Sequence, residues 1–308
     1  MQTYYHHILT NLKYNMNRLF LFMTVAVLLG ACANKGGKNS ITIGISVKND
    51  NSLKIKEGDV MAGVNLTVAE SKRLIAKGIA NHPQVKKKLT KGMVIITSGT
   101  TNTYIAEELA NLDAPRGSFM TGNITPKHIG NVAEGLTRVP NIVLIDGQKA
   151  DISFDDALEQ ISEGDIIFKG ANLLNYEEKQ VAVCIGAATG GTTSRIRPFT
   201  TEGKGRLIVP VGLEKQVYGN LNDYEKLFEN EVEKLSNVPR VWVHHNAEIF
   251  TEIEAIKALA DVNIAPFAAG GIAGSEGGIS LAIYGSKENV QKVLDIISEI
   301  QGEEPFIQ

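Results

Sequence analysis

The chain has 308 residues, and its 31 Lys and Arg against 34 Asp and Glu give a net charge of −3. This balance lacks the excess of basic residues that is typical of nucleic-acid binders, so no nucleic-acid partner is predicted. A chain of this length can bury an apolar core without disulfide bonds, and it contains 2 cysteines.

The N-terminus follows the order of a secretory signal: basic Arg18, an apolar run over residues 19–29, then small Gly30 and Ala31. The run is shorter than the roughly 20 residues of a membrane-spanning helix. Leu29-Gly30-Ala31-Cys32 resembles the lipobox of bacterial lipoproteins. The resemblance implies acylation of Cys32 and a membrane-anchored lipoprotein of the cell envelope that faces the periplasm or exterior. The alternative is that Cys32 ends an ordinary signal peptide.

We therefore divide the chain into a signal over residues 1–32, a tether over 33–40 that is rich in Gly, Lys and Asn, and a folded part. Either Met1 or Met16 can be the true start, because Met16 precedes the basic residue directly. If the signal is removed, Cys184 is left without a partner, so no intramolecular disulfide is expected.

From residue 41 onward, short apolar runs alternate with amphipathic stretches, which predicts a wound, mostly parallel sheet covered by helices over residues 41–235. Thr67 and Glu70 form a capping-box pattern at the start of a helix. Strands are predicted at 93–97, 141–145, 165–169, 181–185 and 206–211, and helices at 103–112 and 154–161.

In residues 236–308 the order of the predicted strands and helices differs from that of the preceding part. Strands are predicted at 240–244, 263–268 and 279–284, with helices at 249–259 and 287–300. This order is typical of a smaller ferredoxin-like α+β module. The glycine-rich stretch 269–278 predicts a backbone that closely approaches a ligand, a partner or the main domain, and a plain hairpin loop is the alternative.

The first candidate site is the turn that follows the strand at 93–97. Its small residues allow backbone N–H groups to converge on an anion, and the start of the next helix adds partial positive charge. The alternative is a purely structural role, in which a tight turn has Ser and Thr side chains that cap the helix. The candidate ligand-binding residues are Ser98, Gly99, Thr100, Thr101 and Asn102.

The second candidate site is the loop that follows the strand at 181–185. Loops after two strands of one sheet are expected to share the crevice at the carboxyl ends of the strands. An arginine here would clamp an acidic group in a bidentate manner, or else be surface charge. The candidates are Thr189, Gly190, Gly191, Thr192, Thr193 and Arg195.

Further candidates follow other strands. Asp146 is the candidate catalytic base and Lys169 the candidate electrophilic or phosphate partner, a role for which Lys215 also qualifies. Gly170 and Asn172 are candidate ligand contacts. The glycine clusters lack Gly-x-Gly-x-x-Gly spacing, so no dinucleotide cofactor is predicted. No metal site is predicted either, because the adjacent histidines at 244–245 would point to opposite faces of a strand.

The stretch 92–109 with Ser98-Gly99-Thr100-Thr101 resembles the strand and phosphate loop of ribose-5-phosphate isomerases. Their superfamily also holds glucosamine-phosphate deaminases, methylthioribose-phosphate isomerases and CoA transferases. Residues 165–172, followed by 183–191, are similar to the Gly-Ala-Asp region of the methylthioribose-phosphate isomerases. The resemblance covers about residues 65–215 and implies an α/β fold with an anion-binding crevice.

Two positions depart from the superfamily pattern. Asn172 stands where the isomerases have an acidic residue, which puts proton transfer in doubt. Glu214 corresponds to the CoA-transferase glutamate only by its place after a strand. The expected function is binding of a small anionic metabolite of the sugar-phosphate or acyl-thioester type, with or without isomerase-like chemistry. The alternative is a non-catalytic surface binding or scaffold lipoprotein, and a homo-oligomer stays open.

Overall fold

A computed structural model describes residues 54–307, except 123, 127–128, 130 and 237. The described residues belong to one compact unit. The predicted signal, the tether and Cys32 lie outside them. None of the described helices is long and apolar enough to cross a membrane.

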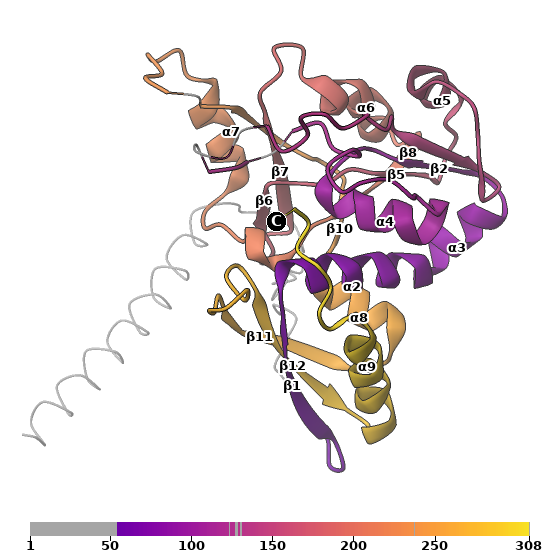
Figure 1. Cartoon of the computed structure of the whole chain (residues 1–308), viewed down its shortest axis with the longest axis vertical. Coiled ribbons are helices and arrows are strands. Elements are labelled where there is room, and N and C mark those ends of the chain that lie inside the picture. The colour runs from indigo at the N-terminus through magenta and orange to yellow at the C-terminus, as the bar shows by residue number, and fades with distance from the viewer. Residues whose placement is uncertain (1–53, 123, 127–128, 130, 237, 308) are drawn as a thin grey trace, which may run out of the picture. The chain divides into compact units, whose positions relative to one another are not determined.

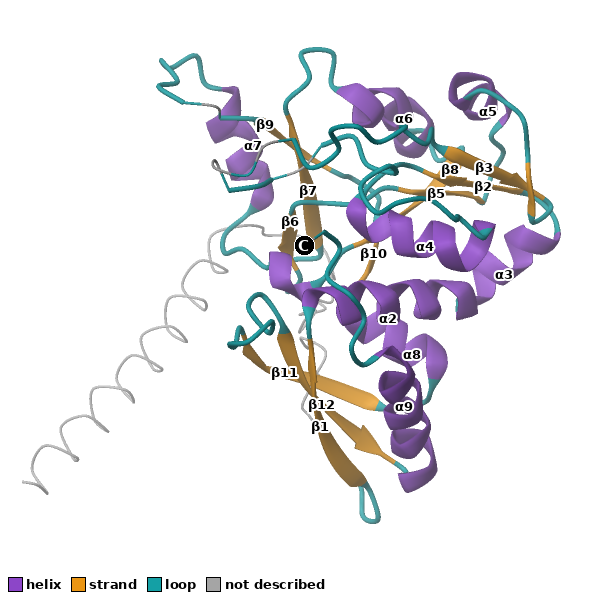
Figure 2. Cartoon of the chain, viewed as in Figure 1, coloured by secondary structure: helices purple, strands orange, loops and turns teal. Residues whose placement is uncertain are grey.

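Helices and strands alternate along most of the chain (Figures 1 and 2). The helices are α2 (Val68–Asn81), α3 (Pro83–Thr90), α4 (Thr100–Ala110), α5 (Phe154–Gln160), α6 (Gly191–Thr201), α7 (Leu221–Glu229), α8 (Glu252–Leu259), α9 (Lys287–Ile300) and the short 3-10 helix η1 (Leu213–Lys215). The strands are β1 (Val60–Leu66), β2 (Met93–Ile96), β3 (Ile142–Ile145), β4 (Gln148–Lys149), β5 (Asp165–Phe168), β6 (Leu173–Asn175), β7 (Gln180–Ile185), β8 (Gly205–Pro210), β9 (Arg240–Val243), β10 (Glu248–Phe250), β11 (Asn263–Ala269) and β12 (Ile279–Gly285).

The largest sheet has 6 strands in the order β10-β8-β5-β2-β3-β4. The first four run parallel to one another, and β3 and β4 are antiparallel to their neighbours. Every residue of β2 and β5 is buried, because helices cover both faces of the sheet: α3 and α4 one face, α5 and α6 the other (Figure 2). The α/β class is therefore confirmed, with a sheet that is mixed.

Two smaller antiparallel sheets complete the fold, in the orders β1-β12-β11 and β6-β7-β9. β7 was expected in the main sheet and β9 in the C-terminal module, but the two pair with each other. β1 pairs with β12, and β10 joins the main sheet beside β8. These pairings cross the boundary that was expected between residues 235 and 236. Local patterns of residues indicate strands but not their partners, which are set by contacts between distant segments.

Helix α2 lies at the centre of the molecule, where it packs against α8, α4 and α9. Its capping box is confirmed: Glu70 N donates to Thr67 Oγ1 at 3.2 Å, and Thr67 N donates to Glu70 Oε2 at 2.8 Å. Leu74, Ile75 and Ile79 are fully buried on its inner side. A capped, amphipathic helix thus connects the main sheet to the sheet formed by β1, β12 and β11.

Candidate functional site

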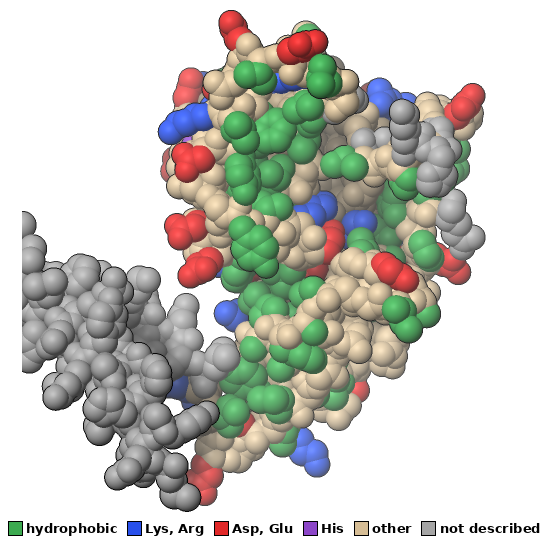
Figure 3. All heavy atoms as spheres, turned by 90° about the vertical axis from the view of Figure 1, so that its left-hand side faces the viewer, with side chains coloured by type: hydrophobic (Ala, Val, Ile, Leu, Met, Phe, Trp, Pro, Cys, Tyr) green, Lys and Arg blue, Asp and Glu red, His purple; other side chains and the backbone are tan. Residues whose placement is uncertain are grey.

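A cavity of about 690 Å³ opens at the carboxyl ends of three neighbouring parallel strands, β2, β5 and β8. This is the edge where open α/β sheets bind their ligands. Figure 3 shows basic side chains inside a hollow on this side of the molecule. The lining residues are Ser98, Gly99, Thr100, Thr101, Asn102, Thr121, Gly122, Ile124, Thr125, Lys169, Gly170, Ala171, Asn172, Val183, Cys184, Gly186, Lys215 and Pro239.

The turn between β2 and α4 presents the N-terminus of α4 to this cavity. Its backbone is fixed from behind, since Ser98 N donates to Asn141 Oδ1 at 2.9 Å and Gly99 N donates to Phe119 O at 2.9 Å. Gly99 is the N-cap, and no side chain caps the helix. The first N–H groups of a helix have no acceptor within it. The alternative prediction is therefore correct about the tight turn between strand and helix, but the side-chain capping that it expects is not found among the described residues.

Asn102 joins the ends of β2 and β5 beneath the cavity. It is fully buried, and its Nδ2 donates to Thr97 O at 2.7 Å and to Phe168 O at 3.2 Å. These bonds fix the direction of the amide. Its Oδ1 has no hydrogen-bond partner among the described residues. A buried acceptor without a partner is unfavourable by about 1–3 kcal/mol, so this oxygen is suited to accept a hydrogen bond from a bound molecule.

Two lysines line the same cavity. Lys169 follows β5 directly, and its Nζ donates to Gly170 O at 3.2 Å. Lys215 ends η1, which follows β8, and its Nζ donates to Ala171 O at 2.9 Å. Burial, together with the positive charge of Lys215, lowers the pKa of Lys169 to about 8. Among the described residues, neither ammonium group forms an ion pair with a carboxylate.

A second group of buried charges supports the segment that carries Lys215. Glu252, at the start of α8, is fully buried and accepts a hydrogen bond from Leu213 N at 3.0 Å. Burial and the nearby charge of Glu214 raise the pKa of Glu252 to about 7. Lys72 on α2 is also buried, and burial followed by the charge of Lys215 lowers its pKa to about 8. The carboxylate of Glu252 thus joins the start of α8 to η1, and none of these three side chains lines the cavity.

The opposite wall of the cavity comes from the segment after β5 and from β7. Asn172 Oδ1 accepts a hydrogen bond from Cys184 N at 2.9 Å, so the predicted ligand residue Asn172 also fixes the wall. Cys184 is a free cysteine that is partly exposed to the cavity. Burial raises the pKa of its thiol, so it is a neutral thiol and not a thiolate at physiological pH.

The structure thus brings the first predicted loop, Lys169, Gly170 and Asn172 together, but it separates Asp146 from them. Strand β3 runs antiparallel to β2, so the residue after β3 lies at the opposite edge of the sheet. There Asp146 Oδ1 accepts a hydrogen bond from Gly92 N at 2.7 Å, and Asp146 N donates to Gly92 O at 2.9 Å. Asp146 closes a turn, and the prediction that it is the catalytic base of this site is wrong.

The second predicted loop is not brought to the cavity either, apart from Gly186 at its start. Strand β7 belongs to the sheet with β6 and β9, so the loop after it leaves the edge where the parallel strands end. Among the described residues, none of the candidates in this loop lines the cavity: Thr189, Gly190, Gly191, Thr192, Thr193 and Arg195.

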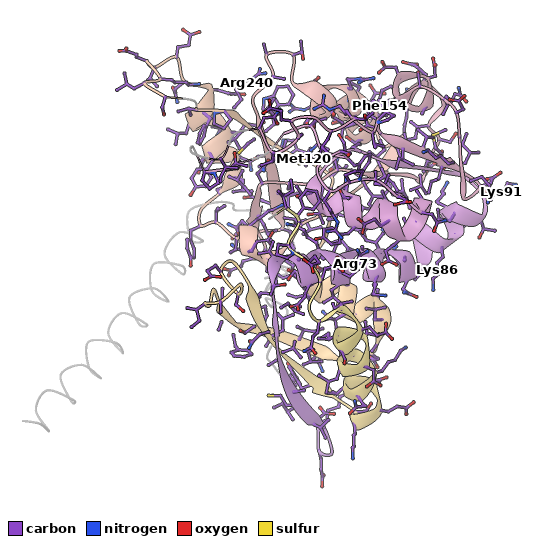
Figure 4. The ribbon with its side chains drawn as sticks, in the orientation of Figure 1. Arg73, Lys86, Lys91, Met120, Phe154 and Arg240 are labelled. Carbon is purple, nitrogen blue, oxygen red and sulfur yellow. The ribbon has the colours of Figure 1, made fainter. Side chains whose placement is uncertain are left out.

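The contacts of these residues explain their places. A Cβ added at Gly190 would lie 2.6 Å from Trp242 Cη2, so this glycine allows the indole ring to pack against the loop. Thr189 is exposed, and Thr193 is buried beside His244 in a separate small hollow. Arg195 pairs with Asp155. Its Cζ lies 4.5 Å from the ring centre of Phe154, the residue that Figure 4 labels beside α6. Arg195 is surface charge, as the alternative prediction held.

Several lining residues had no signal in the sequence. Thr121, Gly122, Ile124 and Thr125 belong to an irregular segment between α4 and β3, and Pro239 precedes β9. The course of an irregular segment, and not the end of a strand, brings these residues to the cavity. No periodicity or motif in the sequence therefore indicates them. A cysteine inside an apolar strand, such as Cys184, likewise gives no sign of the face to which it points.

Within the described part of the chain, no group of three or more His, Cys, Asp and Glu side chains is placed to hold a metal ion. The cavity therefore offers a helix N-terminus, an amide oxygen, hydroxyl groups and two ammonium groups as its polar chemistry. No relative supplies a further guide to its ligand, because no family model, no curated protein and no solved structure matches the chain.

Proposed function

We propose that this protein binds a small anionic metabolite in the cavity between the Ser98 turn and the Lys169 segment. One observation carries the proposal: the uncapped N-terminus of α4 and the ammonium groups of Lys169 and Lys215 face the same cavity. A helix N-terminus carries roughly half a positive charge, so all three elements favour a negative ligand. A phosphate or a carboxylate fits this set of donors.

The electrostatics of the cavity support the same ligand class. Lys169 and Lys215 repel each other, and burial destabilises the charged form of Lys169. The negative charge of an anion between them would offset both effects and raise the pKa of Lys169 back toward 10.5. The volume of about 690 Å³ lies within the roughly 300–1,000 Å³ of small-molecule sites, which suits a sugar phosphate or the acyl end of a thioester.

The lining also bears on the reaction. Its described residues include no Asp or Glu side chain, and Asp146 lies at the other edge of the sheet. Isomerase-like proton transfer by a carboxylate therefore lacks its base, whereas anion binding keeps all of its groups. The alternative remains a scaffold lipoprotein that retains the fold without a ligand.

Calorimetric titration of the purified protein tests the proposal. Ribose 5-phosphate and acetyl-CoA serve as anionic probes, and unphosphorylated ribose is the neutral control. Replacing a charged hydrogen-bond donor removes about 1.5–3 kcal/mol, so Lys215→Gln should weaken anion binding by about 10- to 150-fold. Lys226→Gln makes the same charge change at an exposed side chain outside the cavity and should leave binding unchanged.

The opposite results are equally informative. Failure of every anionic probe to bind would favour the scaffold alternative. Equal weakening by Lys215→Gln and Lys226→Gln would place the anion outside this cavity, because only a general effect of net charge would then be at work.

The lipid anchor belongs to the proposed function as well. It rests on the residues Leu29-Gly30-Ala31-Cys32, and attachment would place the binding domain at a membrane surface. Several acyl chains, at about 0.8 kcal/mol for each buried CH₂, would make this attachment permanent. Cells that express the full chain with Cys32→Ala should lose both labelled palmitate and membrane association. Retention of either one by the variant contradicts the assignment of Cys32.

A further inference from the structure

The amine of Lys169 differs from most lysine side chains in what surrounds it. It lines the cavity, and its one described hydrogen bond goes to the carbonyl oxygen of Gly170 at 3.2 Å. No carboxylate in the described lining holds it in the ammonium form. A lysine that serves only to hold the fold usually pairs with an acid or extends into solvent.

Three titratable groups face Lys169 from the elements around it, namely Lys215 from η1, His244 after β9 and Cys184 from β7. Lys215 carries a positive charge that disfavours a second one. Burial, followed by the charges of Lys169 and Arg197, lowers the pKa of His244 to about 3, so this imidazole is neutral. The thiol of Cys184 is neutral as well. No neighbour in this set stabilises the ammonium form of Lys169.

The consequence is a reactive amine at neutral pH. With a pKa of about 8, about one Lys169 side chain in ten is unprotonated at pH 7, against roughly one in three thousand for an ordinary lysine. Only the unprotonated amine is a nucleophile toward carbonyl carbon. Lys72 has a similar pKa but does not line the cavity, so it has no access to a ligand there.

We propose that Lys169 forms an imine with a carbonyl-bearing anion that binds in this cavity. The nitrogen of Lys169 adds to the carbonyl carbon, and a proton passes from nitrogen to oxygen to give a carbinolamine. The carbinolamine then loses its hydroxyl group and a second proton from nitrogen as water. One C=O bond is thus replaced by one C=N bond, with water as the only other product and no oxidant or reductant consumed.

This proposal rests on the proposed anion site and narrows its ligand class. The N-terminus of α4 and Lys215 would hold the phosphate or carboxylate, while the carbonyl group reaches Lys169 on the neighbouring strand end. The ligand would then be a 2-oxo acid or an open-chain sugar phosphate. An imine withdraws electrons from the adjacent carbon, so it would allow chemistry at that carbon without the carboxylate base that the described lining lacks.

Borohydride trapping tests the imine with paired probes of equal charge. Pyruvate and dihydroxyacetone phosphate carry a carbonyl group, whereas lactate and glycerol 3-phosphate carry a hydroxyl group in its place. Reduction of the imine should increase the intact mass by the probe less one oxygen atom, and peptide mapping should place the adduct on Lys169. Lys169→Arg keeps the charge but has no such amine, so it should give no adduct at this position.

The pH dependence separates a buried amine from an ordinary one. The initial rate of trapping at probe concentrations far below saturation reports the protein before the anion binds, so it should rise with pH around a midpoint near 8. Lys215→Gln removes the neighbouring positive charge, raises the pKa of Lys169 and should move the midpoint to higher pH. A midpoint near 10.5 in the unmodified protein, or an adduct spread evenly over surface lysines, would overturn the proposal.

The two levels of the proposal fail differently. If calorimetry shows binding of both members of each probe pair but borohydride gives no adduct on Lys169, the anion site stands and the imine does not. If no anion binds and no adduct forms, both fall. An adduct on Lys169 with pyruvate or dihydroxyacetone phosphate, absent with their hydroxyl partners, supports the imine.

Discussion

Single buried residues make the stability of this protein depend on pH, and Glu252 does so most directly. Its pKa is raised from 4.5 to about 7 in the folded protein by burial and by Glu214. Between these values the folded state binds more protons than the unfolded state, so Glu252 lowers stability as pH rises through this range. Above about pH 7 the unfavourable contribution of this side chain is complete.

Glu252→Gln should therefore stabilise the protein at pH 8, by about 1–3 kcal/mol, and have little effect at pH 4.5. The amide oxygen can still accept the hydrogen bond from Leu213 N. The amide nitrogen is a donor near Glu214 Oε2, which has no described partner. Urea unfolding at both pH values measures the difference.

Glu299→Gln is the matched control, since the side chain of Glu299 is 66% exposed. It should change stability by less than about 0.5 kcal/mol at either pH. A Glu252→Gln variant that is less stable than the parent at pH 8 would mean that the hydrogen bonds of the carboxylate outweigh the burial of its charge.

At the scale of elements, the contact between α2 and α8 depends on one glycine. A Cβ added at Gly78 would lie 2.4 Å from Ala255 Cα and 2.5 Å from Ala255 Cβ, so the two helix backbones approach too closely for a side chain. Gly78 has ordinary helical geometry, and alanine there would otherwise favour the helix by about 0.5–1 kcal/mol. The contact with the backbone of α8 reverses this preference.

Gly78→Ala should lower the free energy of unfolding by about 1–3 kcal/mol, because α2 and α8 must move apart. Gly63→Ala on β1 is the control, as no heavy atom lies within 4 Å of its added Cβ. Thermal unfolding should show a lower midpoint for the first variant and no comparable loss for the second. An unchanged midpoint for Gly78→Ala would show that the helices separate at little cost.

Elements were predictable where one segment carries all of the information. The fully buried run of β2 and the Thr67–Glu70 capping box fix their own structures, and both were confirmed. The direction of β3 is not encoded in its residues, since an apolar run is the same read either way. Because β3 is antiparallel to β2, Asp146 lies at the edge of the sheet opposite the cavity, and its prediction failed. The prediction for Lys169 placed it at the correct edge, because β5 is parallel to β2.

At the scale of the whole molecule, distant parts of the chain hold one another. β1 pairs with β12 over its full length, and β10 continues the main sheet beyond β8. Arg73 on α2, labelled in Figure 4, binds Glu303 near the C-terminus at 2.8 Å and Glu108 on α4 at 3.1 Å. The domain boundary that the local sequence pattern predicted near residue 235 therefore separates strands that pair with each other. No local pattern could reveal these pairings.

These connections predict that the described part of the chain unfolds as one cooperative unit. Trp242 is the only tryptophan and reports on the sheet of β6, β7 and β9. The variant Trp242→Phe/Phe267→Trp moves the reporter to β11, where Phe267 is 62% exposed and replacement disturbs little packing. Within each protein, fluorescence and circular dichroism should each show one transition, and the two methods should give the same midpoint. Separate midpoints would mean that β1, β12 and β11 unfold independently, and that the strand pairs between the two ends of the chain contribute less than the packing within each sheet.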